Sequence, residues 1–497
     1  MRFNMKLGLI KIIGFVLMLT SLLSCNKNEN SEKVQPPNVL LICVDDLRPE
    51  LGCYENTIIK SPNIDKLASE GVTFMNHFVQ VPTCGASRYS MLTGKRPVSP
   101  YFLGNNIQYS TSPDQPETFI HHLKNNGYYT VGMGKISHSA DGLVYGYTDP
   151  VSDKKELPLS FDEFVFDAGK WETGWNAFFA YANGENRQSM KRQVKPYEEA
   201  DVSDEGYPDG LTANLAISKL KELKNMDKPF FLGVGFFKPH LPFTAPKKYW
   251  DMYNREDIPL TQAPYIPENI NTASLHNSGE FNGYQLTDEK ATLDNPLSDD
   301  YARKVKHAYY ASISYVDAQI GKVLDELKRL QLDKNTIVIL WGDHGWQLGD
   351  HLIWGKHTLF EKALKSALII KSPYAKEKGF RADGIVESID LYPTILELCN
   401  MDPVEGIDGN SLRQQLESPG TKGKEAAYSY FKKGITMRTN KYRLTKYFRK
   451  ESPTMELYDI INDPEETKNI AADNPDIVEV LMPLWKKGNT GLYDPLP

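Results

Sequence analysis

Short apolar runs bounded by polar turns recur along the chain. Such runs are typical of strands buried on both faces, because a strand with one wet face alternates apolar and polar residues. They lie at Asn38–Val44, Tyr128–Met133, Phe230–Phe236, Thr336–Trp341 and Ala367–Ile370. Helical patterns lie between them, so the chain is predicted to form an α/β fold with a central, mostly parallel sheet covered by helices on both faces.

Two helical patterns are clear enough to give boundaries. Ser61 and Pro62 are suited to the cap and first turn of a helix that Gly71 would close. The longest helix is expected from about residue 301 to residue 330. Its apolar stripe consists of Ile313, Ile320, Val323, Leu324 and Leu327. Asp317 falls on this stripe, and we expect it to be a buried, paired carboxylate with a structural role.

Two long polar stretches interrupt the alternation of strands and helices, at about residues 184–210 and 261–300. Both are too long for simple connections, so we expect them to cross the carboxyl edge of the sheet, where α/β proteins bind ligands. After about residue 420 the pattern becomes that of hairpin strands followed by a short helix. This change predicts a small C-terminal α+β subdomain at residues 421–497, after a catalytic domain at residues 38–420.

The N-terminus has the pattern of an export signal. Basic residues flank the apolar run IIGFVLMLTSLL, which is short for a membrane span and ends in LLSC at Cys25. This ending resembles a bacterial lipobox, which predicts a signal peptide at residues 1–24, lipidation of Cys25 and a flexible tether at residues 25–37. A standard cleaved signal with an incidental cysteine is the alternative. The expected product is an exported lipoprotein, periplasmic or held at the outer membrane or cell surface by its lipid alone.

Composition and charge narrow the possible functions. With 40% hydrophobic and 24% charged residues, the chain is that of an ordinary globular protein, and its net charge of −7 argues against a nucleic-acid partner. Five unevenly spaced cysteines do not form a disulfide scaffold. Cys43 and Cys399 lie in apolar surroundings typical of core residues, whereas Cys84 lies in the small and polar stretch CGASR. Cys84 is therefore a candidate for chemistry.

Acidic residues follow two of the predicted strands. Asp45 and Asp46 come directly after Asn38–Val44, and Asp343 and His344 follow Thr336–Trp341 closely. Carboxylates gathered at one edge of a sheet need a cation between them, and carboxylate oxygens are ligands of hard divalent ions. The two pairs together predict a metal site.

Cationic and imidazole side chains follow the other strands. Lys135 and His138 lie in GKISH, His240 in KPH and Lys356 in WGK, while Arg88 follows Cys84 in the same segment. Lysine and arginine around a metal are suited to an anion with several oxygens, such as sulfate or phosphate.

These motifs together resemble the type I, formylglycine-dependent sulfatases. CGASRYSMLTGKRP is similar to the signature of that family, with Ala86 where many members have proline. The resemblance extends along the mature chain through LLICVDDLRPELGCYE, SPNIDKLASEGVTF, GKISH, FFKPHLPF, GDHGWQLGDHLIWGK and ELYDIINDPEETKNIA. Within the family, the chain most resembles the iduronate-2-sulfatase branch. The resemblance implies an alkaline-phosphatase-like fold.

The resemblance also implies roles for the candidate residues. A sulfatase-maturing enzyme would convert Cys84 into formylglycine (3-oxoalanine), whose hydrate attacks sulfur and then releases sulfate by returning to the aldehyde. One Ca²⁺ would be held by Asp45, Asp46, Asp343, His344 and the modified Cys84. Arg88 would orient the hydrate, and Lys135 and Lys356 would bind sulfate oxygens. His138 would accept a proton from the hydrate, while His240 would contact substrate and protonate the leaving oxygen. The other histidines, among them His276 and His357, are expected to be structural.

The resulting hypothesis is an exported sulfuric ester hydrolase. Its expected substrates are sulfated oligosaccharides, cleaved by exo-action at a 2-O-sulfated uronic acid of glycosaminoglycan or algal, ulvan-type origin. One alternative is a phosphatase or phosphodiesterase of the same superfamily, which would need more metal ligands than the sequence supplies. The other is an inactive carbohydrate-binding lipoprotein, for which Cys84 would stay an unmodified thiol.

Overall fold

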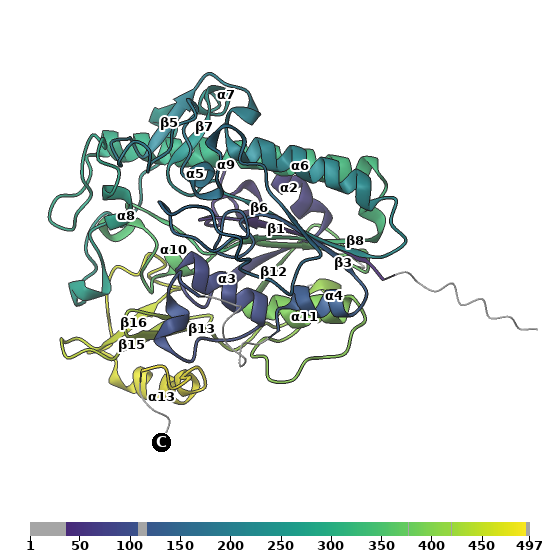
Figure 1. The fold of residues 1–497 in the computed structure, drawn as a ribbon. Coiled ribbons are helices and arrows are strands. Elements are labelled where there is room, and N and C mark those ends of the chain that lie inside the picture. The colour runs from purple at the N-terminus through teal and green to yellow at the C-terminus, as the bar shows by residue number, and fades with distance from the viewer. Residues whose placement is uncertain (1–35, 108–116, 376, 419, 494–497) are drawn as a thin grey trace, which may run out of the picture. The chain divides into compact units, whose positions relative to one another are not determined.

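The computed structural model describes residues 36–107, 117–375, 377–418 and 420–493. Its main element is an eight-stranded sheet in which only β11 runs antiparallel to its neighbours (Figure 1). In sheet order the strands are β12 (Phe380–Glu387), β2 (Val72–Phe78), β11 (Leu368–Lys371), β8 (Thr336–Gly342), β1 (Asn38–Val44), β6 (Phe230–Phe236), β3 (Tyr129–Gly134) and β4 (Glu163–Val165). The predicted large, mostly parallel sheet is confirmed.

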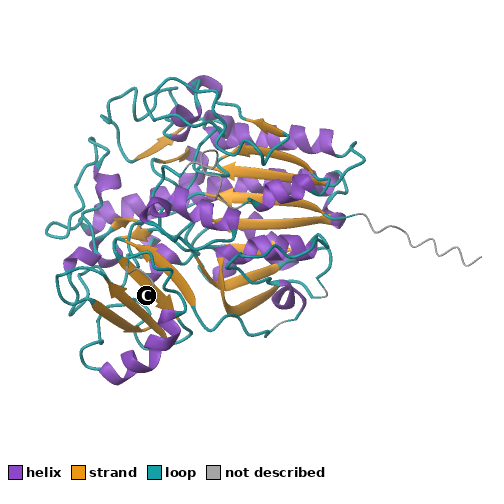
Figure 2. Cartoon of the chain, turned by 60° about the horizontal axis from the view of Figure 1, so that its bottom comes forward, coloured by secondary structure: helices purple, strands orange, loops and turns teal. Residues whose placement is uncertain are grey.

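Helices pack on both faces of this sheet. In Figure 2 the strands (orange) form one layer, and helices (purple) lie against it. Leu40, Ile42 and Val44 of β1 pack in a core with the helices α2 (Pro62–Glu70), α6 (Pro208–Leu223) and α9 (Asp299–Arg329). The alternate residues Val39, Leu41 and Cys43 pack in a second core with α3 (Cys84–Thr93), α4 (Phe119–Asn125) and α11 (Leu391–Leu398). An unbroken apolar strand thus serves two cores, because successive side chains point to opposite faces.

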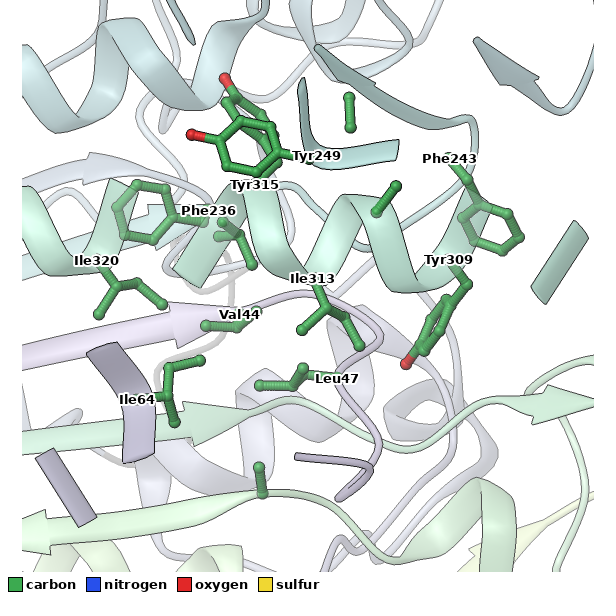
Figure 3. Packing of buried hydrophobic residues seen from close by; sticks show 14 of the residues in the cluster. Val44, Leu47, Ile64, Phe236, Phe243, Tyr249, Tyr309, Ile313, Tyr315 and Ile320 are labelled. Carbon is green, nitrogen blue, oxygen red and sulfur yellow. The ribbon is translucent and has the colours of Figure 1, made fainter. Parts of the chain in front are cut away.

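Helix α9 lies over the end of β1. Ile313 and Ile320 point from the helix toward Val44 and Leu47 (Figure 3), and all four side chains are fully buried. The same helix places Asp317 at the start of α2, where its carboxylate accepts hydrogen bonds from the backbone N–H of Asn63 at 3.1 Å and of Ile64 at 2.7 Å. Asp317 is therefore the buried, paired carboxylate that was expected.

The cap of α2 differs from the prediction. The Ser61 hydroxyl accepts from the backbone N–H of Gly52 at 3.1 Å and makes no capping bond to α2. The free N–H groups at the start of α2 are satisfied by Asp317 instead, because a charged carboxylate from a packed helix is a stronger acceptor than a local hydroxyl.

The C-terminal part forms an antiparallel sheet of β13 (Ala427–Phe431), β14 (Gly434–Arg438), β15 (Tyr442–Tyr447) and β16 (Met455–Asp459). Helix α13 (Pro475–Lys486) packs on it through Trp485, which is 1% exposed. This arrangement confirms the predicted α+β subdomain.

Short elements occupy the long connections. They are β5 (Tyr197–Ala200), β7 (Phe243–Pro246), β9 (Gln347–Leu348), β10 (Trp354–Gly355), α5 (Gly174–Phe178), α7 (Lys247–Trp250), α8 (Gly279–Asn282), α10 (Glu361–Leu364) and α12 (Arg413–Glu417). Strands β5 and β7 pair in parallel outside the main sheet. Within the described ranges, we find no helix that is both long and apolar enough to cross a membrane.

Candidate active site

The two acidic motifs meet at one edge of the main sheet. Strands β1 and β8 are parallel neighbours in register, with Val44 opposite Gly342, so the residues that follow them lie side by side. The backbone N–H of Asp46 donates to Asp343 Oδ1 at 2.9 Å. Asp46 has a φ of +58°, a left-handed conformation uncommon for a residue with a side chain and often found at functional turns.

Cys84 is the first residue of α3, and its side chain is 2% exposed. Its Sγ lies 3.3 Å from His344 Nε2 and 3.3 Å from Lys356 Nζ. The next residue must be glycine, because a Cβ at Gly85 would lie 2.8 Å from Asn105 Cα. A helix N-terminus favours negative charge, so α3 presents Cys84 where an anion is stabilised.

The carboxylates of Asp45, Asp46 and Asp343 form a cluster, with ligand atoms all within 4.8 Å of one another and no exposed area. Burial raises the pKa of Asp46 well above its usual range, and burial together with Asp45 raises the pKa of Asp343. Burial would also raise the pKa of Asp45, but Lys135 and His240 outweigh it and hold that pKa well below the usual range. Three buried carboxylates in contact fit a hard divalent cation, which prefers oxygen ligands.

Three cations surround the carboxylates. Arg88 bridges two of them, with Nη2 3.2 Å from Asp45 Oδ1 and Nε 3.0 Å from Asp343 Oδ2. Lys135 Nζ lies 2.6 Å from Asp45 Oδ2. Lys356 Nζ lies 2.9 Å from Asp46 Oδ1, on the side of Cys84. These cations are at most 2% exposed, so their charges act with little screening from water.

His240 lies between the acidic cluster and a further carboxylate. Its Nε2 is 3.0 Å from Glu280 Oε1 and 3.9 Å from Asp46 Oδ2, and its Nδ1 is 2.6 Å from the Leu241 carbonyl oxygen. Burial, helped by Lys356, lowers the pKa of His240 to about 4, whereas Glu280 opposes this shift. Glu280 is thus the group that favours a proton on Nε2.

His138 contacts residues outside the acidic cluster. Its backbone N–H donates to Glu156 at 3.2 Å, and its ring packs on Trp175 with centroids 5.3 Å apart. Its Nδ1 is buried without a hydrogen-bond partner among the described residues. Burial and the nearby Lys135 lower its pKa well below the usual range. A neutral imidazole with a free nitrogen is suited to accept a proton.

A pocket of about 480 Å³ opens beside His138, and Tyr147 and Trp175 contribute to its lining. A second pocket of about 520 Å³ lies beyond Ser137 and is lined by none of the predicted site residues. Of these two pockets, the first is the one that a predicted site residue, His138, helps to line.

The structure brings together residues from six separate stretches, those of Asp45, Cys84, Lys135, His240, Asp343 and Lys356. Of the predicted site residues, only Cys25 lies outside the described part of the chain. Sequence reasoning missed Glu280, which comes from the polar stretch 261–300, and Glu156, whose carboxylate accepts from the Ser137 hydroxyl at 2.6 Å. Neither carboxylate belongs to a motif or a periodic pattern. Only the unusual length of the polar stretch 261–300 indicated that a functional residue such as Glu280 could lie there.

Comparison with known families gives two matches. The sulfatase family model matches residues 37–401. A model described as the C-terminal region of N-sulphoglucosamine sulphohydrolase matches residues 349–490. The matches together span the sheet, the site and the C-terminal subdomain.

Curated relatives agree with these matches. Human iduronate 2-sulfatase (Homo sapiens) is 31% identical over 417 residues, which cover 78% of this chain and 74% of the human protein. A sulfatase of Formosa agariphila is 32% identical over 483 residues, covering 92% of this chain and 88% of that protein. An ulvan-active sulfatase of the same organism is 26% identical over 489 residues, covering 95% and 84%.

Solved structures share the fold. An enzyme in complex with its substrate D-glucosamine-2-N,6-O-disulfate matches with a TM-score of 0.70 at 21% identity, over 92% of this chain and 98% of that chain. A phosphonate monoester hydrolase of Agrobacterium radiobacter matches with a TM-score of 0.71 at 22% identity, over 91% and 94%. Both likenesses support the alkaline-phosphatase-like architecture. With its family match, its relatives and this fold, the chain belongs to the sulfatase family of sulfuric ester hydrolases, in the iduronate-2-sulfatase-like branch.

Proposed function

We propose that this sulfatase removes the O-sulfate from a 2-O-sulfated uronic acid at the end of a polysaccharide-derived oligosaccharide. The observation that carries the proposal is the placement of Cys84, buried between an acidic cluster and Lys356. The similarity to iduronate 2-sulfatases supports the uronic acid, and the ulvan-active relative supports an algal source as well as glycosaminoglycans. The side chains around Cys84 are almost fully buried, with Cys84 and Lys356 at 2% exposure and His240 at 4%. Such a site admits the end of a sugar chain more readily than its middle, which supports exo-action.

Cys84 acts as a precursor in this proposal. Burial raises the pKa of its thiol to about 12, so the unmodified side chain is neutral and a poor nucleophile. Members of the family generally use formylglycine, whose hydrate supplies one hydroxyl for attack on sulfur and a second for release of sulfate. A maturing enzyme must therefore oxidise Cys84, and it must do so before α3 is packed, because every residue of that helix is buried.

Asp45, Asp46 and Asp343 would hold one Ca²⁺, with His344 and the modified Cys84 beside them. The carboxylate oxygens fit this ion, whereas the imidazole of His344 is an unusual ligand for it. The ion would supply positive charge that favours ionisation of the nucleophile and neutralises sulfate oxygens. Arg88 keeps two of the carboxylates in place through its ion pairs.

The remaining residues bind sulfate and move protons. Lys135 and Lys356 offer ammonium groups to sulfate oxygens, on which charge grows in the transition state. His240 would protonate the sugar oxygen as it leaves, and its contact with Glu280 supports this role. His138 would accept a proton from the nucleophile, and its unpartnered Nδ1 supports this role.

The test is release of inorganic sulfate from a panel of sulfated disaccharides of glycosaminoglycan and algal origin. Cys84→Ala should lower turnover of the best substrate by more than about 10³-fold, because the reacting side chain is gone. Its thermal unfolding should stay close to that of wild type, since alanine fits a helix start.

The matched control is Cys53→Ser, at a part-buried cysteine outside the site, which should keep full activity. Mass spectrometry of active protein should show an aldehyde at position 84, and metal analysis should show calcium. Turnover retained by Cys84→Ala would refute the proposal. A preference for phosphate esters, with zinc bound, would support the phosphatase alternative.

We further propose that the protein is exported and anchored through a lipid on Cys25. The support is the sequence pattern of residues 1–25. Labelling with a lipid precursor should mark the wild-type protein and not Cys25→Ala. Equal labelling of both would contradict the anchor.

A further inference from the structure

Arg187 is a buried cation without a carboxylate partner. Five arginines of the described chain are at least nine-tenths buried: Arg48, Arg88, Arg187, Arg438 and Arg443. The other four each form an ion pair with an aspartate or a glutamate. Arg187 is 8% exposed, has no ion pair with a described carboxylate, and its Nε has no hydrogen-bond partner there. A buried charge left unpaired is costly, so an anion that completes it would bind well.

The backbone holds Arg187 in place independently of any ligand. It follows α5 in the stretch that sequence analysis predicted to cross the sheet edge. Ala180 forms a β-bridge with Asn186, and the N–H of Arg187 donates to the Phe179 carbonyl at 3.1 Å. The guanidinium stacks on the Phe179 ring, with Cζ 3.5 Å from the ring centroid. One face of the guanidinium is thereby covered. Tyr284 lies on it as well, with its ring centroid 5.5 Å from Cζ, and Nε is the nitrogen left without a hydrogen-bond partner among the described residues.

The Phe178–Phe179 pair connects Arg187 with the catalytic site. The two ring centroids are 4.7 Å apart. Lys135, a predicted sulfate ligand, lies 4.2 Å from the Phe178 centroid, whereas Arg187 stacks on Phe179. The His240 ring packs against both rings, at 4.5 Å and 6.3 Å. Phe179 therefore contacts both Arg187 and His240, the residue proposed to face the leaving sugar.

Tyr147 lies near Arg187 in the wall of the pocket beside His138. Its ring lies 5.9 Å from Arg187 Cζ and 4.7 Å from the ring of Trp175 in the same wall. Burial raises the pKa of its hydroxyl, Lys135 and Arg187 lower it, and Cys84 raises it, so the hydroxyl is within electrostatic reach of both ends. The ring is 38% exposed and offers an apolar face against which a sugar can pack.

We propose that Arg187 binds the carboxylate of the uronic acid whose sulfate is removed. This inference rests on the proposed function, since it assigns the second anionic group of that substrate. A planar guanidinium matches a carboxylate with two parallel hydrogen bonds, and charge-assisted bonds of this kind are the stronger ones. The sulfate end would lie among Lys135, Lys356 and Cys84, while the carboxylate end would lie on Arg187. Arg187 is thus a specificity residue for acidic sugars.

The experiment compares a 2-O-sulfated uronate disaccharide with its carboxyl-reduced counterpart, which keeps the sulfate and lacks the carboxylate. Arg187→Ala should lower kcat/KM for the uronate by about 10- to 100-fold, the range expected for hydrogen bonds to a charged group. The same variant should change kcat/KM for the reduced substrate by less than about twofold. For Arg187→Lys, kcat/KM for the uronate should lie between the values of wild type and Arg187→Ala. Lysine keeps the charge but lacks the planar guanidinium that forms two parallel hydrogen bonds. Arg192→Ala, at an exposed arginine of the same loop, is the control and should match wild type.

Equal losses on both substrates would overturn the proposal and make Arg187 a structural residue. No loss on either would overturn it as well, as would a loss confined to a disulfated amino sugar without a carboxylate. A binding measurement separates this inference from the proposed reaction. Cys84→Ala protein should bind the uronate disaccharide at least about tenfold more tightly than Cys84→Ala/Arg187→Ala protein. Equal affinity of the two proteins would overturn the proposal even if the wild type released no sulfate.

Discussion

Individual buried charges determine how the site can bind an anion. Asp45, Asp46 and Asp343 supply three negative charges, and Arg88, Lys135 and Lys356 supply three positive ones, all with almost no exposure. A divalent cation would leave this group with excess positive charge, which favours a sulfate ester in a site of low dielectric. Glu280 adds a carboxylate beside His240, the proposed proton donor to the leaving sugar oxygen.

Glu280→Gln should lower kcat by about 10- to 100-fold, because general acid catalysis contributes about 10²–10⁴-fold and His240 would lose its charged partner. KM should change less, since the predicted sulfate ligands remain. Steady-state kinetics on the best substrate gives both values. The control is Glu268→Gln, which changes a 70% exposed side chain in the same polar stretch, residues 261–300. An unchanged kcat in Glu280→Gln would show that His240 acts without this partner.

His77 should make the stability of the protein depend on pH. Burial lowers its pKa from the usual 6.5 to about 4, and its ring lies 2.9 Å from the Ser388 hydroxyl. Between these pH values His77 binds the proton in the unfolded chain and not in the folded one. His77 alone should therefore lower the free energy of unfolding by up to about 3 kcal/mol as pH drops from 6.5 to 4.

Urea unfolding at a series of pH values measures this dependence. His77→Gln should be less stable than wild type at pH 7 but should show a flatter slope below pH 6.5. His121→Gln, at a 25% exposed ring, should keep the slope of wild type. Equal slopes for His77→Gln and wild type would contradict the assignment.

At the scale of elements, helices are held by groups from distant parts of the chain. The start of α2 is capped by Asp317 of α9, which lies more than two hundred residues further along the chain and also accepts from Asn63 Nδ2 at 2.8 Å. Helix α3 likewise depends on Asn105, which accepts from the Gly85 N–H at 2.9 Å. Such caps connect helix formation to tertiary packing, since neither helix satisfies its first N–H groups alone.

Asp317→Ala should lower the free energy of unfolding by about 1–3 kcal/mol, because several buried donors lose their acceptor at once. Asp317→Asn should cost less, since its amide oxygen can still accept. Denaturant unfolding at neutral pH measures both. Asp325→Asn lies on the same helix at a 69% exposed side chain and should have little effect. A stability loss in Asp325→Asn as large as that in Asp317→Ala would argue against the cap.

At the scale of the whole molecule, buried ion pairs connect the C-terminal sheet with the segment that carries Lys356, a proposed sulfate ligand. Arg443 of β15 pairs with Glu361 of α10 and, at 2.5 Å, with Glu466. Arg438 of β14 joins the same network, with Nε 2.9 Å from Glu361 Oε2. Helix α10 begins five residues after Lys356, so these pairs hold the loop of Lys356 against the small sheet.

Arg443→Met should lower the free energy of unfolding by about 3–5 kcal/mol, because it leaves two carboxylates buried with fewer partners. The melting temperature and the urea midpoint should both fall. Lys441→Met changes a 54% exposed lysine near the same strand and should leave both unchanged. If Arg443→Met is as stable as wild type, the network makes no net contribution to the free energy of unfolding.

Local sequence was sufficient where a strand is buried on both faces or a motif is continuous. Strands β1, β6 and β8 were predicted to within a residue, because their apolar runs are unbroken. Strands β2 and β12 were missed: β2 contains the polar residues Asn76 and His77, and β12 contains Arg381 and Asp383. Hydrogen bonds to neighbouring strands, and not an apolar pattern, define those two.

The sequence by itself determined the sheet architecture, the residues of the acidic and cationic motifs and the importance of Cys84, because each depends on residues adjacent in the chain. Tertiary structure alone decided that β1 and β8 are neighbours, that Glu280 pairs with His240, and that Arg187 has no ion pair with a described carboxylate. The physical reason is that strand order and pairing between loops depend on which distant segments exclude water together, and no local pattern carries that information.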